Sequence, residues 1–354
     1  MINFSKIDNI NPFSLVQKEK DKIFFNLQKK LSQIHFDRCE EYKKITNNIF
    51  GNINKIEKLE NLPFLHSNLF KDHNLKSTTN QKFLVMKSSG TTGKNNSKIN
   101  VDFETSMLQS RVLKKIIFDF LPKNGEDIFF IDSIETYKNN KVISARKAAI
   151  RGFAQFFKNK KFLLDSKNNL KINLLKNFIQ KNKNKEIILF GFTSFVWEKF
   201  IKILLKKKIK FGENKITLIH GGGWKKLKDQ EISKLKFNKI LTEKIGIKKV
   251  HNYYGMVEQT GSIFMDCEYL NFHTSVFSEV LIRDSSFNTL KKDESGIIQT
   301  FSLLPLSYPG HNIITEDIGI IKGIDDCKCG RKGKYFEVIG RVKNAELRGC
   351  SDVY

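Results

Sequence analysis

The sequence has 354 residues and a formal net charge of +25, from 62 lysines and arginines against 37 aspartates and glutamates. Hydrophobic residues make up 40% and aromatic residues 12%, which is enough for a large core and excludes a wholly disordered chain. The chain begins without a signal-peptide pattern and contains no apolar run long enough to cross a bilayer. We therefore expect a cytoplasmic protein with no membrane span.

The positive charge is spread along the whole chain. Only eight of the 62 basic residues are arginines, and the lysines are scattered through stretches rich in asparagine, isoleucine and phenylalanine. A protein that binds nucleic acid usually concentrates its charge and uses arginine for planar contacts with phosphates and bases. We therefore expect a solvated lysine surface and no nucleic-acid partner, with a basic nucleic-acid-binding or nucleotide-dependent regulatory protein as the alternative class.

Helices alternate with short apolar strands over most of the chain. Apolar residues at helical spacing predict helices over about residues 12–60, which would cover a neighbouring sheet. Further helices are predicted at 105–121 and 195–207. Strands are predicted at 82–87, 128–131, 186–191, 216–223 and 249–255. Because most of these strands end in glycine turns, the pattern indicates a parallel or mixed sheet flanked by helices, with ligands at the carboxyl ends of its strands.

The hydrophobic period becomes two beyond about residue 262, which predicts a smaller, mainly antiparallel β lobe. The predicted fold class is therefore α/β with this β lobe attached. We expect an N-terminal helical region over 1–75, an α/β core over 76–261, the β-rich lobe over 262–340 and a tail over 341–354.

The most distinctive local motif is SSGTTGK, which begins at Ser88 and is followed by Lys98. Its two glycines allow successive backbone amides to face one anion, while hydroxyl and ammonium groups add donors and positive charge. This chemistry suits a polyphosphate. The motif is not a P-loop, because Ser88 stands where the first glycine of GxxxxGK[ST] belongs. Taken alone, the segment is equally compatible with a polar hairpin turn.

This motif resembles the phosphate-binding loop of the adenylate-forming superfamily, which includes acyl-CoA synthetases and luciferase-like ligases. Further segments resemble other motifs of that superfamily in the same order, namely HGGGWKKL (220–227), YYGMVEQTG (253–261), TEDIG (315–319) and GRVKN (340–344). The segments NPFSLVQKEK, LPFLHSNLFK and LRGC resemble the acyl-protein synthetase (LuxE-type) family, with phenylacetate-CoA ligases next. The resemblance implies the large N-terminal domain of the adenylate-forming fold without its small C-terminal domain.

The resemblance also implies a site for ATP and Mg²⁺. Glu258 would hold the magnesium ion, Asp317 would accept hydrogen bonds from the ribose, and Arg341 would contact the ribose or the α-phosphate. The phosphates would lie on Ser89, Gly90, Thr91, Thr92, Gly93, Lys94 and Lys98, with Lys94 acting in catalysis. The adenine would lie on Gly221, Gly222, Gly223, Tyr254 and Gly255. Each assignment has a structural alternative. Glu258 would then be a salt-bridged glutamate and Tyr254 a core tyrosine. Asp317 would be a turn aspartate and Arg341 a surface arginine.

Two departures from the superfamily affect the chemistry. Glu316 stands where the ribose motif has glycine. The C-terminal domain that normally supplies a lysine to the adenylation transition state is expected to be absent, so another cation is needed. Lys98, Lys225 and Lys226 are the candidates by motif position.

Cys350 distinguishes an acyl-protein synthetase from a CoA ligase. In the family that the chain resembles, a cysteine at this place accepts the acyl group as a thioester, and the neighbouring Arg348 favours the nucleophilic thiolate. We therefore expect ATP-dependent activation of a fatty or related carboxylic acid, with transfer to Cys350 and then to a partner such as an acyl reductase. The alternative is an acyl- or aryl-CoA or acyl-carrier-protein ligase, with Cys350 an accidental exposed thiol. The acyl pocket is expected near the junction at 186–197.

The other cysteines suggest a structural metal site. Cys267, His273, Cys327 and Cys329 supply the number of soft ligands that a closed zinc site needs. Zinc here would attach the β lobe to the sheet and would take no part in catalysis. Plain reduced thiols are the alternative.

Overall fold

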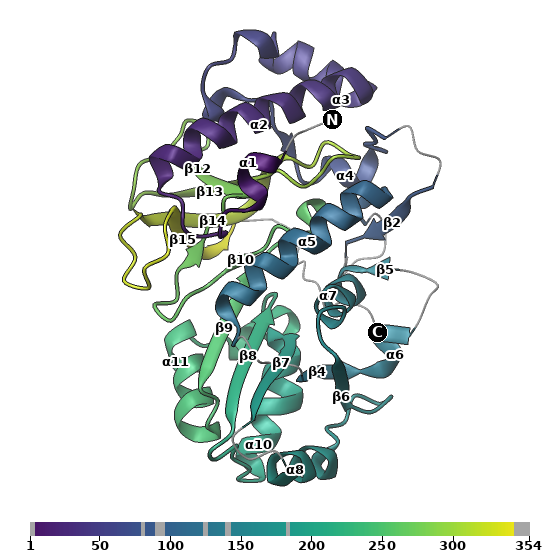
Figure 1. Cartoon of the computed structure of the whole chain (residues 1–354), viewed down its shortest axis with the longest axis vertical. Helices are drawn as coiled ribbons and strands as arrows, with labels where there is room; N and C mark the ends of the chain where they lie inside the picture. Colours follow the sequence, from purple (N-terminus) through teal and green to yellow (C-terminus); the bar gives the residue numbers. More distant parts are fainter. Residues whose placement is uncertain are drawn as a thin grey trace.

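The computed structural model describes residues 4–78, 82–88, 96–122, 127–138, 143–181 and 185–342. Along the long axis, the N-terminal helices lie at one end and the parallel sheet at the other, with the β lobe and the diagonal helix α5 between them (Figure 1). The SSGTTGK motif, called the phosphate-loop motif below, lies outside the described residues from 89 onward, as does the tail that carries Cys350.

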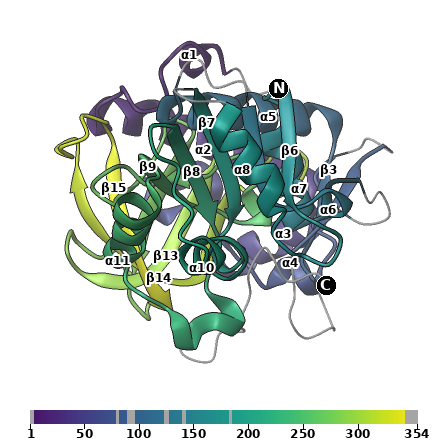
Figure 2. The same cartoon turned by 90° about the horizontal axis from the view of Figure 1, so that it is seen from below.

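A parallel sheet forms the α/β core. Its strands follow the order β10-β9-β8-β7-β4-β6, all parallel except the edge strand β10. Figure 2 shows β7, β8 and β9 side by side. Their bounds are β4 (Asp127–Ser133), β6 (Asn159–Leu164), β7 (Glu186–Phe192), β8 (Lys215–Gly221), β9 (Lys249–Tyr254) and β10 (Phe264–Met265).

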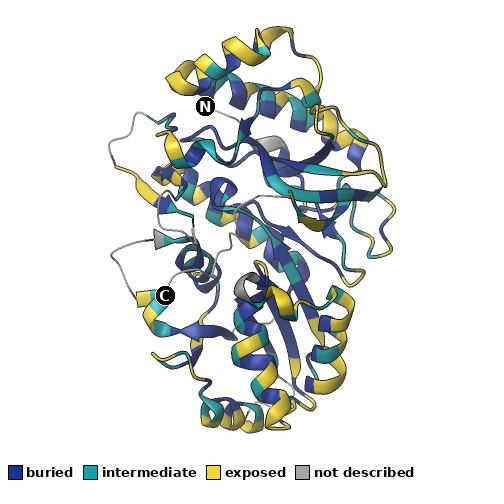
Figure 3. Cartoon of the chain, turned by 180° about the vertical axis from the view of Figure 1, so that it is seen from behind, coloured by how far each residue is buried: buried dark blue, intermediate teal, exposed yellow. Residues whose placement is uncertain are grey.

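Helices cover both faces of this sheet. Phe129 and Phe130 are consecutive and fully buried, yet they belong to different hydrophobic clusters, because successive side chains of a strand point to opposite faces. One face packs against α5 (Phe103–Phe120) and α7 (Ala145–Ala154). The other packs against α8 (Ile172–Lys181), α9 (Thr193–Phe195), η4 (Val196–Ile201), α10 (Lys202–Lys206), α11 (Lys234–Lys239) and η6 (Ile240–Ile245). Figure 3 shows buried strands between helices whose outer faces are exposed.

The predicted β lobe is a second sheet, with strand order β11-β15-β14-β13-β12 and antiparallel pairing along that path. Its strands are β11 (Phe272–His273), β12 (Ser278–Arg283), β13 (Ser295–Ser302), β14 (Asn312–Ile324) and β15 (Lys334–Arg341). The sequence did not predict β1 (Leu65–His66), a strand of only two residues that pairs with β14 in parallel. The lobe therefore includes a strand from the N-terminal region.

The N-terminal helices cover the β lobe. In α2 (Gln17–Arg38), the Nε2 atom of Gln28 donates to the backbone oxygen of Ser302 at 2.9 Å, and Lys20 Nζ lies 3.0 Å from a Glu279 carboxylate oxygen. The predicted helical region is interrupted at Cys39, whose backbone is extended. It continues as α3 (Glu40–Ile45), η1 (Thr46–Phe50), η2 (Ile53–Lys55), η3 (Leu59–Asn61) and α4 (Leu69–Asp72), with α1 (Ser5–Asp8) before it.

A small third sheet brings the phosphate-loop motif to the core. It has the order β3-β2-β5 and consists of β2 (Leu84–Lys87), β3 (Lys98–Val101) and β5 (Ile143–Ser144). The remaining elements are α6 (Ile134–Lys138), η5 (Lys225–Gln230) and η7 (Val257–Gln259). Within the described ranges, no helix is both long enough and apolar enough to span a membrane.

Candidate active site

A cleft of about 890 Å³ opens at the carboxyl ends of β8 and β9, against β14 and β15 of the lobe. Segments far apart in the sequence meet here, as the motifs predicted. The predicted site residues that line the cleft are Gly222, Gly223, Tyr254, Gly255, Glu258, Asp317 and Arg341. Ser88, at the start of the phosphate-loop motif, lines the same cleft.

Two hydrogen bonds join Ser88, which lines this cleft, to Ser97. The Ser88 amide donates to the Ser97 carbonyl at 3.0 Å, and the Ser97 amide donates to Ser88 Oγ at 2.9 Å. These bonds hold the end of β2 against the residue that precedes β3. Lys87 pairs with Ser144 across β2 and β5, so the first turn of α7 lies beside this end of β2. Ser89, Gly90, Thr91, Thr92, Gly93 and Lys94 lie outside the described residues.

Five other predicted residues are absent from the described lining of the cleft. Lys98 begins β3 and is exposed. Gly221 is absent from the lining, and a Cβ atom added there would lie 2.3 Å from the Tyr253 ring. Packing within the protein is therefore sufficient to require glycine at 221. The side chains of Lys225 and Lys226, like Cys350, lie outside the described part of the chain.

Asp317 joins the two sheets at the cleft. Its Oδ2 atom accepts a hydrogen bond from the Tyr254 hydroxyl at 2.7 Å, and Oδ1 lies 3.2 Å from Arg341 Nε. Burial raises the pKa of Asp317, while the Tyr254 hydroxyl and the Arg341 charge act to lower it. The unusual Glu316 also has a structural reason, because its carboxylate bridges Asn68 and Arg341 at 2.9 Å each. Glu316 thereby holds Arg341 at the edge of the cleft.

Glu258 lies in η7, directly after β9, and is 95% buried although its side chain borders the cleft. Its backbone oxygen is packed against Gly310, where an added Cβ would lie only 2.4 Å away. The negative charge of Glu258 contributes, after burial, to raising the pKa of the Tyr308 hydroxyl. The fold therefore holds a carboxylate rigidly at the wall of a cleft, a position suited to binding a cation.

The structure adds two polar residues that motif matching missed. Asn252 on β9 and Lys234 at the start of α11 both line the cleft. Asn252 Oδ1 and Lys234 Nζ are buried atoms with no hydrogen-bond partner. A buried polar atom of this kind is costly unless a ligand or water satisfies it. The signal available in the sequence was the position of Asn252 directly before the Tyr-Tyr-Gly motif.

A second cavity of about 250 Å³ adjoins the first and shares Ala145, Tyr253, Gly255, Met256 and Val257 with it. It lies between α5 and α7, and most of its wall is apolar or small. Further lining residues are Met86, Leu113, Gly152, Phe153, Gly261 and Ile263.

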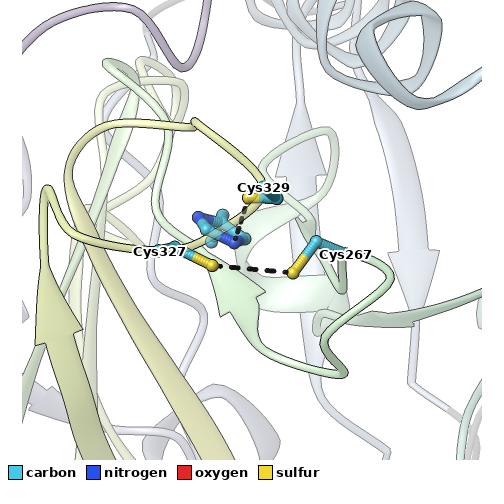
Figure 4. Close-up of side chains that lie close together, drawn as sticks. Cys267, Cys327 and Cys329 are labelled. Carbon is cyan, nitrogen blue, oxygen red and sulfur yellow. Dashed lines mark hydrogen bonds between the residues drawn. The ribbon is translucent and has the colours of Figure 1, made fainter.

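The predicted metal ligands converge in the β lobe. Cys267, Cys327 and Cys329 point toward a common centre (Figure 4), and the ligand atoms of these residues and His273 all lie within 4.8 Å of one another. The Cys267 and Cys327 sulfurs are 3.8 Å apart, and Cys329 Sγ lies 3.4 Å from His273 Nε2. Tetrahedral zinc with Zn–S bonds of about 2.3 Å separates its sulfurs by about 3.8 Å, so the donor set fits this ion.

The family of the chain follows from a profile comparison. The profile described as acyl-protein synthetase, LuxE, matches residues 2–354. The chain belongs to this LuxE family. Long-chain-fatty-acid–luciferin-component ligases of Vibrio harveyi and Aliivibrio fischeri are 27% and 28% identical over 175 and 177 residues. These alignments cover 48% of the chain and 45% and 46% of the two ligases, so the chain spans about half the length of the curated relatives it matches.

Solved structures show the fold of this LuxE-family chain. 2-Hydroxyisobutyryl-CoA ligase, in its postadenylation state with R3-HIB-AMP, has a TM-score of 0.70 and 13% identity, covering 97% of this chain and 72% of the ligase. An open conformation of that ligase with 2-HIB-AMP and CoA has a TM-score of 0.71 and 13% identity, covering 94% of this chain and 77% of the ligase. The α/β fold predicted from the sequence, that of an adenylate-forming ligase, is confirmed.

Proposed function

We propose that this protein uses ATP to activate a fatty or related carboxylic acid as an acyl-adenylate and then transfers the acyl group to a protein thiol. One observation carries the proposal: motif residues from the parallel sheet and from the β lobe line one cleft beside an apolar cavity. Pyrophosphate exchange into ATP that depends on an added carboxylic acid tests it directly. Absence of exchange with any acid in a panel of different chain lengths would refute it.

In the first step, a carboxylate oxygen of the acid attacks the α-phosphorus of ATP, and the bond from that phosphorus to the pyrophosphate oxygen breaks. The protein contributes positioning and charge complementarity. Asp317 would accept from the ribose hydroxyls, exchanging part of its contact with Tyr254 and Arg341 for them. Asn252 Oδ1, which has no partner, would accept from the adenine amino group above Tyr254. The phosphate-loop motif, with Lys94, would hold the β- and γ-phosphates.

Glu258 is the proposed magnesium ligand. Mg²⁺ usually binds one or two carboxylates together with phosphate oxygens, and Glu258 presents a buried carboxylate at the cleft. The bound ion would neutralise charge on the phosphates. Glu258 would position the ion, and with it the phosphates, relative to the ribose at Asp317.

The apolar second cavity is the proposed acyl site. It shares Gly255 and Met256 with the cleft, so a carboxylate in the cleft would place its alkyl chain between α5 and α7. This differs from the predicted position near the 186–197 junction. From that junction, Thr193 lines the first cleft, whereas none of its residues lines the second cavity.

Replacing Gly152 by leucine should shorten the longest acid that the enzyme accepts. Gly152 lines the second cavity, and an added Cβ already lies 3.3 Å from Leu113, so a larger side chain would occupy the acyl site. We expect kcat/KM for long-chain acids to fall at least ~10-fold more than kcat/KM for short-chain acids. One methylene group in a hydrophobic pocket changes kcat/KM by roughly 10- to 200-fold. Gly152→Ala is the control, and an unchanged chain-length profile in Gly152→Leu would place the acyl site elsewhere.

In the second step, a thiolate attacks the acyl carbonyl carbon and AMP leaves, giving a thioester. Cys350 is the proposed acceptor, as the resemblance to acyl-protein synthetases implies, and a partner thiol such as that of an acyl reductase or an acyl carrier protein would receive the group next. We place the reaction in the cytoplasm. The unbridged cysteines of the described residues fit such a reducing compartment.

Replacing Cys350 by serine should separate the two steps. Pyrophosphate exchange should persist, because the adenylation site is intact, while the hydroxylamine-labile acyl adduct seen by intact-mass analysis should disappear. Ser351→Ala, at the adjacent position, should keep both. If Cys350→Ser still forms thioester product with CoA at the wild-type rate, the protein is a CoA ligase and Cys350 is no acceptor.

We also propose that Cys267, His273, Cys327 and Cys329 bind a structural zinc ion. Cys267 follows β10 of the parallel sheet, whereas Cys327 and Cys329 lie in the β14–β15 turn of the lobe. A zinc ion with these ligands has no open position for a substrate. It would connect the two sheets that form opposite walls of the cleft.

A further inference from the structure

Lys234 has a buried ammonium group with no hydrogen bond. Its Nζ atom lies 4.7 Å from the centre of the Phe272 ring and 4.0 Å from a Glu337 carboxylate oxygen, at the limit of an ion pair. Lys234 is the only lysine among the described residues that line the cleft. Burial is the main cause that lowers its pKa. The chain therefore keeps a hydrogen-bond donor in the cleft with no acceptor of its own.

Asn252 provides a matching acceptor nearby. Both residues interact with Asp266. The backbone amide of Asn252 donates to Asp266 Oδ1 at 2.5 Å, and the positive charge of Lys234 acts on the same carboxyl group. The cleft thus holds a buried donor, Lys234 Nζ, and a buried acceptor, Asn252 Oδ1, and neither atom has a hydrogen-bond partner.

Lys234, Asn252 and Glu258 come from three different elements of the cleft lining. Asn252 precedes Tyr254 on β9, and Lys234 lies near Phe272 and Glu337, whereas Glu258 follows β9 at its carboxyl end. With magnesium and phosphates near Glu258 and the ribose at Asp317, the base would extend toward Asn252 and Lys234. Adenine presents an amino donor with ring-nitrogen acceptors beside it, which is the complement of this pair.

We infer that Lys234 is a specificity residue that donates a hydrogen bond to a ring nitrogen of adenine next to its amino group, while Asn252 accepts from the amino group. This inference rests on the proposed function, because it assumes that the cleft binds ATP. Lys234, which lies outside every motif of the sequence, would then recognise the adenine base. Lys234 contacts no reacting atom, so its effect is on nucleotide binding.

The test is a comparison of nucleotides by calorimetry in the absence of acid, with wild type and Lys234→Met. The probes are ATP, 7-deaza-ATP and 1-deaza-ATP, which lack one or other ring nitrogen beside the amino group. Wild type should lose about tenfold in affinity for one deaza analogue, the scale of a hydrogen bond to a charged donor. Lys234→Met should bind ATP about as weakly as wild type binds that analogue, and should show no further loss with the analogue itself.

Lys239→Met is the matched control, since Lys239 lies on the same helix, is exposed and pairs only loosely with Glu243 at 3.9 Å. It should bind every nucleotide as wild type does. Lys234→Arg should recover part of the affinity for ATP, which a purely structural role for Lys234 would not predict. The inference is overturned if Lys234→Met binds ATP as tightly as wild type. It is also overturned if both proteins lose the same affinity when ATP is replaced by either deaza analogue. Failure of wild type to bind ATP at all would instead refute the proposed function.

Discussion

Replacing Glu258 by glutamine should reduce acid-dependent pyrophosphate exchange by at least ~100-fold. The substitution keeps the shape of a buried side chain at the cleft wall but removes the charge that would hold magnesium against the phosphates. Losses of this size are typical when one preorganised electrostatic group is removed from an active site. The measurement is exchange at saturating ATP and acid over a range of magnesium concentrations, and high magnesium should restore part of the rate.

The matched control for this experiment is Glu231→Gln. Glu231 is an exposed carboxylate on the lining of the same cleft, so its replacement removes the same charge from a different part of the cavity. We expect its exchange rate to stay near that of wild type. If Glu258→Gln is as active as Glu231→Gln at every magnesium concentration, Glu258 is a structural residue and the ion must bind elsewhere.

Replacing Cys327 by serine should remove zinc from the protein and destabilise it. Purified wild type should contain one zinc ion per chain, and the variant close to none, by metal analysis. The free energy of unfolding should fall by about 3 kcal/mol or more, since a ligand present at 100 to 1,000 times its Kd stabilises by ~2.7–4.1 kcal/mol. Cys327 lies in the turn between β14 and β15, which carry Asp317 and Arg341, so the KM for ATP should also rise.

Cys39→Ser is the control for the zinc experiment. Cys39 is a buried, unbridged cysteine between α2 and α3, away from the ligand cluster, and its loss should leave the zinc content unchanged. A chelator should lower the melting temperature of this control and of wild type but hardly affect Cys327→Ser. A wild-type protein that contains no zinc, and whose melting temperature is insensitive to chelator, would contradict the proposal.

Strands buried on both faces were recognisable in the sequence. The prediction at 186–191 agrees closely with β7, because a continuous apolar run bounded by polar residues and glycine is typical of such strands. The prediction at 249–255 also agrees with β9, although His251 and Asn252 interrupt its apolar residues. The strand β6 was missed, since its first half, Asn-Lys-Lys, is polar and exposed. The strand β1 was missed because two residues carry no detectable period, and only pairing with β14 makes them a strand.

The candidate site likewise contains residues that the sequence pointed to and residues that only the tertiary structure brought there. Motif order predicted that Tyr254, Glu258 and Asp317 belong to one site, and the structure places all three on one cleft. Lys234 had no motif around it, so its position in the cleft depends on how α11 packs beside β11 and β15. Gly221 is a motif glycine whose packing against Tyr253 could not be read from the motif.

The sequence by itself determined which short segments carry glycines, carboxylates and thiols, and the alternation that builds each sheet, because these depend on local periodicity and residue chemistry. Only the tertiary structure decided that the two sheets face each other across one cleft, that a second, largely apolar cavity lies between α5 and α7, and that Cys267 meets Cys327. The physical reason is that such contacts join residues far apart in the chain. Their formation depends on the combined packing of many side chains, which no local pattern records.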